Sequence, residues 1–143
     1  MTTATDLLAD RIAVVDTVTA YSTALDNRDW PLFESLFTPD AVWDYSAADQ
    51  RCTGPAEILA RVRPGIERLD ATQHFVTNHV VTIAGDEAAH SCYYLAQHMR
   101  GGERFLAAGR YRDLLHRTES GWRIASRLLS NTWTDGNPSV VLQ

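Results

Sequence analysis

The spacing of apolar residues changes from a helical to a strand period near the middle of the chain. Over residues 7–25 they recur every three or four positions, which predicts an amphipathic helix. DNRDWPLFESLF predicts a short second helix, because Asp29 can cap it and Pro31 fits its first turn. AVWDYS alternates as a strand does. TGPAEILARVRPGIERL then returns to helical spacing, and we expect Pro64 to kink or split this third helix.

Four alternating segments follow, covering residues 73–83, 88–99, 104–116 and 122–132. The short links AGDE, RGGE and TESG separate them and predict antiparallel hairpins. One early strand, three helices and this meander predict a single α+β domain over residues 1–143. Its curved sheet should fold over the helices.

The segment DATQHFVTNHV holds two histidines, His74 and His79, five residues apart in a predicted strand. Side chains of equal parity share one face of a strand, so His74 and Asn78 should face one way and His79 the other. We therefore do not expect the two histidines to bind one metal ion. His79 is expected to face away from any pocket that His74 lines.

The next two strands place polar and aromatic side chains on common faces, which predicts a concave pocket for a small molecule. A structural role stays open for each residue taken singly, because a strand histidine is often exposed or hydrogen-bonded and a tyrosine often serves packing alone. The residues that share these faces are Cys92, Tyr94, Ala96 and His98 on one strand and Phe105, Ala107, Gly109, Tyr111 and Asp113 on the next.

The composition excludes several function classes. A formal net charge of −5 and an isoelectric point near 5.4 argue against a nucleic-acid partner. No apolar run approaches the ~20 residues that cross a bilayer, and the start MTTATDLLADR lacks the features of a signal peptide, so we expect a cytoplasmic protein with no membrane partner. Dinucleotide, P-loop, serine-hydrolase and zincin motifs are absent from the sequence.

The two cysteines are too few for a four-cysteine zinc site, and we expect both to be reduced thiols. Cys52 falls in a polar, loop-like stretch and Cys92 in a strand. An occasional disulfide or a reactive Cys52 remains an alternative.

Asp26 follows the last apolar position of the first helix, where the helix dipole disfavours a carboxylate. One interpretation is a solvated acid at the end of the helix. The other is a carboxylate that orients a histidine, fixes its tautomer and stabilises its protonated form.

The order of several motifs resembles the SnoaL-like branch of the NTF2-like superfamily over residues 12–137. These motifs are YSTALDNRDWPLFESLFTPDAVWDYS, TQHFVTNH, YYLAQHM, GRYRDLLHRTESGWRI and a terminal W-x-x-G-N. The resemblance implies a cone-shaped barrel in which a strongly curved, mixed and largely antiparallel sheet wraps around N-terminal helices and encloses a pocket. The family includes scytalone dehydratases, hexachlorocyclohexane dehydrochlorinases and polyketide cyclases, and the first two catalyse eliminations with a His–Asp pair.

Carried onto this sequence, the resemblance implies four catalytic residues: Asp26, His74, Tyr45 and His98. The side chains expected to bind substrate are Tyr21, Asn78, Tyr94, Tyr111 and Phe105. Leu25 stands where scytalone dehydratases carry a catalytic tyrosine, so the substrate is not expected to be scytalone. No cofactor and no metal are expected.

The predicted function is a cofactor-independent lyase, a dehydratase acting on a hydroxylated cyclic, aromatic, polyketide or steroid-like substrate. A cyclase or isomerase could use the same pocket, and a non-catalytic ligand-binding module is a further alternative. His74, His98 and Asp26 could also form a two-His-one-carboxylate iron site. The resemblance implies a homo-oligomer, a dimer or trimer that buries the outer sheet face, where Phe75, Val81 and Trp133 are expected.

Overall fold

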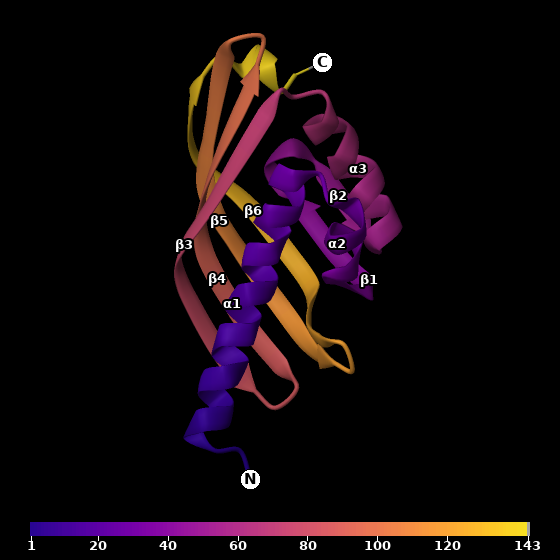
Figure 1. Cartoon of the computed structure of the whole chain (residues 1–143), viewed down its shortest axis with the longest axis vertical. Helices are drawn as coiled ribbons and strands as arrows, with labels where there is room; N and C mark the ends of the chain where they lie inside the picture. The colour runs from indigo at the N-terminus through magenta and orange to yellow at the C-terminus, as the bar shows by residue number, and fades with distance from the viewer. Residues whose placement is uncertain (143) are drawn as a thin grey trace.

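The computed structural model describes residues 1–142 and has helices against one face of a six-stranded sheet (Figure 1). The α+β class predicted from the sequence is confirmed. The helices are α1 (Ala4–Asn27), α2 (Trp30–Ser35) and α3 (Pro55–Glu67), with short 3-10 turns η1 (Ser46–Ala48) and η2 (Pro138–Val140). The strands are β1 (Phe37–Tyr45), β2 (Gln50–Thr53), β3 (Ala71–Ala84), β4 (Glu87–Arg100), β5 (Glu103–Thr118) and β6 (Gly121–Gly136).

Local capping explains where the first two helices begin. Thr3 and Asp6 form a reciprocal capping box at the start of α1, and the Asp29 carboxylate accepts a hydrogen bond from Leu32 N–H at the start of α2. Both predicted helices are confirmed. α1 ends at Asn27, and the left-handed φ of 54° at the next residue, Arg28, turns the chain toward α2.

The third helix is not split at Pro64, contrary to that expectation. α3 continues through Pro64 as a single helix. A proline removes the N–H that would bond to the carbonyl four residues earlier. That residue, Ala60, is exposed to solvent. Water can therefore bind the freed carbonyl, and the helix persists.

The sheet is open, with the strand order β2-β1-β6-β5-β4-β3. β1 and β6 are parallel, and every other neighbouring pair is antiparallel. The three predicted hairpins are therefore confirmed. The sequence pattern missed the short edge strand β2, and it was wrong to predict a loop at Cys52, which is buried within that strand.

A β-bulge in β3 reverses the side-chain alternation in the second half of that strand. The register with β4 shifts between Thr77 and Val80, and Asn78 has a left-handed φ of 55°. One extra residue moves all later side chains to the opposite face. Val81 is consequently buried on the helix side, so its predicted place on the outer face is wrong.

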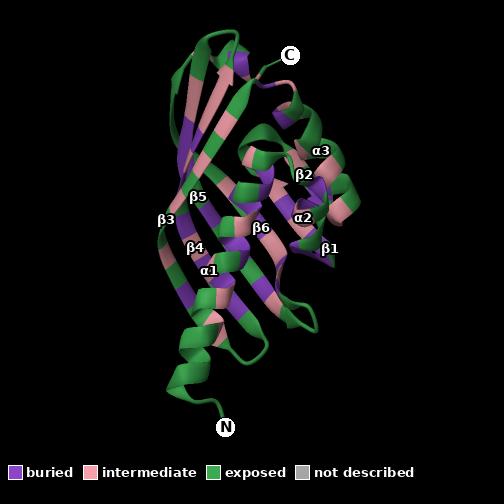
Figure 2. Ribbon diagram, in the orientation of Figure 1, coloured by how far each residue is buried: buried purple, intermediate pink, exposed green. Residues whose placement is uncertain are grey.

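The core lies where α1 crosses the sheet, and Figure 2 shows the buried residues concentrated there. Aliphatic and aromatic side chains from one face of α1 pack against the inner faces of β5 and β6. The first turns of α1 extend past the core and are exposed. No helix among residues 1–142 has both the length and the apolar character needed to cross a membrane. The principal core residues are Val14, Val18, Tyr21, Leu25, Tyr111, Leu115 and Ile124.

Candidate active site

A histidine–carboxylate pair joins the end of α1 to β3. His74 Nδ1 lies 2.7 Å from Asp26 Oδ1, and the His74 backbone N–H donates to Asp26 Oδ2 at 2.9 Å. The Thr72 hydroxyl donates to Asp26 Oδ1 at 2.9 Å. The carboxylate thus holds the Nδ1–H tautomer of His74 and leaves Nε2 with a free lone pair. Asp26 orients a histidine, as one of the two interpretations of the sequence proposed.

The three hydrogen bonds also explain how a carboxylate is tolerated at the negative end of a helix dipole. Burial by itself raises the pKa of Asp26, but the donors from His74 and Thr72 outweigh it and hold this pKa below its ordinary value. The carboxylate therefore stays ionised near neutral pH. An ionised Asp26 stabilises the cation that His74 becomes after taking a proton.

His98 faces His74 from the neighbouring strand β4. The two ring centroids are 5.9 Å apart, and the rings are nearly perpendicular, at 84°. His98 Nδ1 lies 3.1 Å from the Phe105 carbonyl oxygen, which fixes the proton of the neutral ring on Nδ1. Burial and, next, the proximity of His74 lower the pKa of His98. Neutral His98 therefore presents an acceptor, Nε2, on the side opposite the Phe105 carbonyl.

A chain of hydrogen bonds orients the hydroxyl of Tyr45. Tyr94 donates to the side-chain oxygen of Asn131, and the Asn131 amide N–H donates to the Tyr45 hydroxyl oxygen. Because Tyr45 accepts this bond, its own O–H is left to donate into the cavity. Burial raises the pKa of Tyr94, which keeps the first donor of the chain protonated.

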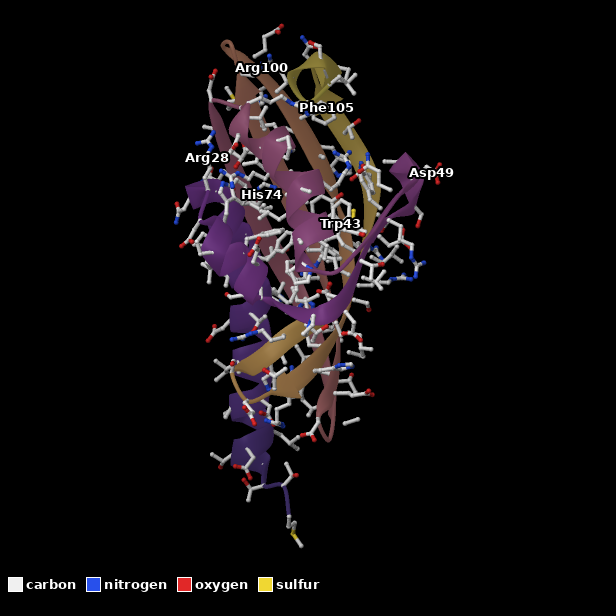
Figure 3. All side chains as sticks on the ribbon, turned by 90° about the vertical axis from the view of Figure 1, so that its right-hand side faces the viewer. Arg28, Trp43, Asp49, His74, Arg100 and Phe105 are labelled. Carbon is white, nitrogen blue, oxygen red and sulfur yellow. The ribbon has the colours of Figure 1, made fainter. Side chains whose placement is uncertain are left out.

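These groups line one cavity of about 420 Å³ between the sheet, α1 and α3. A cavity of this size matches the range of small-molecule sites. Figure 3 shows the labelled His74, Trp43 and Phe105 in the upper half of the molecule, each from a different strand. Besides the two histidines, the wall is mainly aromatic and aliphatic, and it includes Tyr21, Leu25, Trp43, Tyr45, Ile66, Tyr94, Phe105, Tyr111, Leu129 and Leu142.

The structure brings nearly all the predicted site residues together. His74, Tyr45 and His98 line the cavity, and Asp26 lies directly behind His74. The predicted binding residues Tyr21, Tyr94, Tyr111 and Phe105 line it as well.

Asn78 does not line the cavity, so that prediction is wrong. It sits in the β3 bulge, with its side chain exposed. The strict alternation that paired it with His74 ends at this bulge. The same shift turns His79 toward the helix side, where its Nδ1 lies 3.0 Å from His90 Nε2, so the expectation that His79 faces away is also wrong.

Sequence reasoning missed Asn131, Trp43 and the two residues Val141 and Leu142 near the C-terminus, all of which line the cavity. Trp43 had a signal, because it shares a strand face with Tyr45. Asn131 had no such signal in the sequence, because a register shift between β5 and β6 precedes it and changes the face that alternation would predict.

The iron alternative finds no support in this geometry. Within residues 1–142, the cluster whose ligand atoms converge is His79, His90 and Cys92. Asp26 and His74 instead bond each other directly.

The SnoaL-like domain model matches residues 6–128 of this chain. The chain belongs to the SnoaL-like family. The resemblance inferred from the motifs is therefore confirmed, and the match covers most of the chain.

Individual relatives agree with this assignment. Terrestric acid biosynthesis cluster protein E of Penicillium crustosum is 34% identical over 146 aligned positions, covering 95% of this chain and 92% of that protein. A candidate aromatic ring hydroxylase from Novosphingobium aromaticivorans has 27% identity and a TM-score of 0.85, covering 94% of this chain and 97% of that one. A candidate scytalone dehydratase from the same organism shares the fold, with 24% identity, a TM-score of 0.84 and coverage of 91% and 89%. These matches support a domain that converts small molecules.

Proposed function

We propose that this SnoaL-like domain is a lyase that dehydrates a hydroxylated cyclic compound by general acid–base catalysis. The observation that carries the proposal is the His74–Asp26 pair at the wall of the aromatic cavity. The contact between the Asp26 carboxylate and His74 Nδ1 leaves Nε2 as the basic atom. General bases of this kind typically increase the reaction rate by about 10²–10⁴-fold.

The reaction begins with transfer of a proton from substrate carbon to His74 Nε2. The electron pair of the broken C–H bond moves toward an adjacent carbonyl, and the Tyr45 hydroxyl donates a hydrogen bond to the developing oxyanion. Asp26 stabilises the imidazolium that His74 becomes. One donor to an oxyanion is worth about 10²–10³-fold in rate.

Departure of the hydroxyl group completes the elimination. The C–O bond breaks as the carbon–carbon double bond forms, and protonated His98 supplies the proton that converts the leaving hydroxide into water. His98 becomes neutral and is then reprotonated, either by His74, whose ring centroid is 5.9 Å away, or by solvent, to which His74 releases its proton. Both histidines thus return to the protonation states in which they started.

The cavity favours flat, largely apolar ring systems. Its aromatic lining can stack on a planar substrate, while the two histidines and Tyr45 contact a few polar groups. Leu25 lines the cavity where scytalone dehydratases carry a tyrosine, which supports a substrate other than scytalone. A related biosynthesis cluster protein from Penicillium crustosum supports a substrate from secondary metabolism.

One observation favours a second candidate, an isomerase or cyclase. The lowered pKa of His98 makes this residue mostly neutral near pH 7, when it accepts a hydrogen bond rather than donating a proton. Isomerisation and cyclisation need only the base and the oxyanion donor, so they proceed without a protonated His98.

The test is turnover of a panel of hydroxylated aromatic and polyketide-type ring compounds, followed by mass spectrometry. Dehydration lowers the product mass by one water, whereas isomerisation leaves the mass unchanged. His74→Ala and Asp26→Asn should each reduce kcat by about 10²–10⁴-fold. His116→Ala is the matched control, because this histidine lies on the surface beside Glu87.

Near wild-type rates in both His74→Ala and Asp26→Asn would rule out the proposed base. A ligand that binds the wild-type protein and is recovered unchanged after long incubation would instead favour the binding-module alternative.

A further inference from the structure

A second polar cluster lies outside the catalytic cavity. It contains His79 on β3, His90 and Cys92 on β4, Asp113 on β5 and Arg127 on β6. None of these five side chains lines the catalytic cavity. All except His79 are buried. The cluster therefore does not contact the substrate of the reaction proposed above.

Tyr21 and Tyr111 separate the cluster from the catalytic cavity. Both tyrosines line the cavity, and the Arg127 guanidinium lies 4.2 Å from the Tyr21 ring centroid and 4.0 Å from that of Tyr111. Arg127 in turn donates two hydrogen bonds to Asp113, of 2.7 and 2.9 Å. The interior is thus divided into two polar sites with a layer of aromatic rings between them.

The β3 bulge brings the cluster together. Regular alternation from His74 onward would point His79 to the outer face, but the extra residue at Thr77–Asn78 turns it inward. His79 Nδ1 consequently lies 3.0 Å from His90 Nε2. The single irregularity in the pairing of β3 with β4 thus places one histidine beside another.

The orientation of His90 is fixed by a carboxylate. His90 Nδ1–H donates to Asp113 Oδ2 at 2.8 Å, so the lone pair of Nε2 points toward His79. Metal-binding histidines commonly donate their second ring N–H to a carboxylate in this way, which sets the tautomer and increases the basicity of the ligand nitrogen. Asp113 is held by Arg127 and is therefore rigid.

Three side chains of the cluster, His79, His90 and Cys92, each offer one ligand atom to a tetrahedral cation. One nitrogen each from His79 and His90 and the Cys92 sulfur all lie within 4.8 Å of one another. Zinc bonds nitrogen at about 2.0–2.1 Å and sulfur at about 2.3 Å, so tetrahedral ligand atoms stand roughly 3.3–3.6 Å apart. The two nitrogens, now 3.0 Å apart, must therefore separate by a few tenths of an ångström, and the sulfur, which lies within 4.8 Å of both, must approach by no more than about 1.2 Å.

An entry path exists beside α1. His79 and Val81 line a cavity of about 250 Å³ together with residues of α1, among them Arg11 and the exposed acid Asp16. A cation can reach His79 through this cavity. Its fourth coordination position can face the same space and be filled by water.

We propose that His79, His90 and Cys92 form a binding site for a zinc-class divalent cation, with the fourth position open toward α1. Burial raises the pKa of the Cys92 thiol to about 12, so a bound cation must displace the thiol proton. Zinc and cobalt bond sulfur strongly, whereas magnesium and calcium prefer oxygen. The site should therefore exclude magnesium and calcium.

The first test is titration of the metal-free protein with cobalt(II), a spectroscopic substitute for zinc. One equivalent should bind and produce a thiolate-to-cobalt charge-transfer band together with the visible bands of tetrahedral cobalt, and zinc should displace it. Cys92→Ala should lose the charge-transfer band. Cys52→Ala, which removes the other buried free thiol, should keep it.

The second test measures zinc affinity by competition with a chromophoric chelator. His79→Ala should weaken binding by more than about tenfold, because even outer-shell changes at metal sites cost 10–100-fold. His79 is only partly buried, so this variant should fold, as circular dichroism can verify. His116→Ala, at the surface, is the matched control and should bind as the wild type does.

The proposal is overturned if the folded wild-type protein binds no equivalent of cobalt or zinc. It is also overturned if the charge-transfer band survives in Cys92→Ala, or if zinc affinity survives in His79→Ala. Loss of binding in His74→Ala with retention in His79→Ala would place the ion at the catalytic histidines and would equally refute the site. Turnover in the proposed reaction does not enter any of these measurements.

Discussion

Asn131 sets the direction in which the Tyr45 hydroxyl donates its hydrogen bond. Its amide group accepts from Tyr94 through oxygen and donates to Tyr45 through nitrogen. An amide suits this position because it offers a donor and an acceptor at the same time. The role assigned to Tyr45 therefore depends on a side chain from a different strand.

Asn131→Asp should reduce kcat almost as much as Tyr45→Phe, by about 10²–10³-fold, with a smaller effect on KM. The aspartate cannot donate, so Tyr45 would turn its O–H toward it and away from the substrate. Steady-state kinetics of the two single variants and the double variant would check this. The losses should not add, because both changes remove the same donor. Additive losses, or a normal kcat in Asn131→Asp, would contradict it.

The lowered pKa of His98 predicts how the proposed dehydratase responds to pH. The pKa lies below 6.5, so the protonated fraction of His98 falls as pH rises through this lowered value. A reaction that needs a proton from His98 should therefore lose kcat as pH rises over about pH 5 to 8.

The measurement is a pH profile of kcat for the wild type and for His98→Gln. The falling alkaline limb should be present in the wild type and absent from the variant. A wild-type kcat that stays constant or rises over this range would favour the isomerase or cyclase, in which His98 acts only as an acceptor.

At the scale of elements, the close approach of the neighbouring strands β5 and β6 at Gly109 leaves no room for a side chain. A Cβ at this position would lie 1.9 Å from the Ser130 carbonyl oxygen and 2.8 Å from the Tyr94 hydroxyl. The register between the strands shifts beside this glycine, which brings the β6 backbone close. Gly109 thus permits the contact between Tyr94 and Asn131.

Gly109→Ala should lower the free energy of unfolding by about 1–3 kcal/mol through overpacking. It should also lower kcat, since it displaces the partners of Tyr45. Gly65→Ala in α3 is the matched control, because its new Cβ would meet only the end of the Arg68 side chain at 3.8 Å. This control should gain about 0.5–1 kcal/mol from helix propensity. Chemical denaturation of both variants tests the pair, and equal effects would contradict the argument.

Periodicity predicted the elements that are long and regular and missed those that are short or irregular. α1, α2 and the four long strands followed from repeating apolar positions. β2 has only four residues, QRCT, which is too few for an alternation to be visible. The β3 bulge had only a weak signal, in that asparagine tolerates the left-handed φ that Asn78 adopts.

Site residues on regular segments were likewise predicted correctly, and those beyond an irregularity were missed or misplaced. His74, Tyr45 and His98 lie on regular segments, so the motifs and strand parity placed them correctly. The Asp26–His74 contact joins residues 48 positions apart and followed from the family resemblance, since no local pattern encodes it. Asn131 and His79 both follow a shift in strand register, and parity counted along one strand cannot detect a shift relative to its neighbour.

At the scale of the whole molecule, an apolar row crosses the face of the sheet that points away from α1. Phe75 pairs with Leu95, Leu95 with Ala108, and Ala108 with Trp133, on four adjacent strands. Phe75 and Trp133 are about half exposed, at 45% and 50%. Exposed apolar patches of this kind often mark protein interfaces.

We expect this row to bury against another copy of the chain, as the family resemblance implies for a dimer or trimer. Trp133→Glu should then shift the mass measured by size-exclusion chromatography with light scattering to that of a monomer. Leu8→Glu, an equally exposed apolar position on α1, should leave the assembly intact. A wild-type protein that is already monomeric, or an unchanged mass in Trp133→Glu, would contradict this expectation.

The bulge at Thr77–Asn78 also determines where the chain can change its length. Insertions and deletions at the hairpin turns leave each strand's faces as they are. Removing Asn78 would likewise restore uninterrupted pairing without changing any partner on β4, so His79 and Val81 would stay on the helix side. Among relatives, a gap at this position is therefore compatible with the buried histidine pair, and the catalytic half of the strand, which precedes it, keeps its orientation.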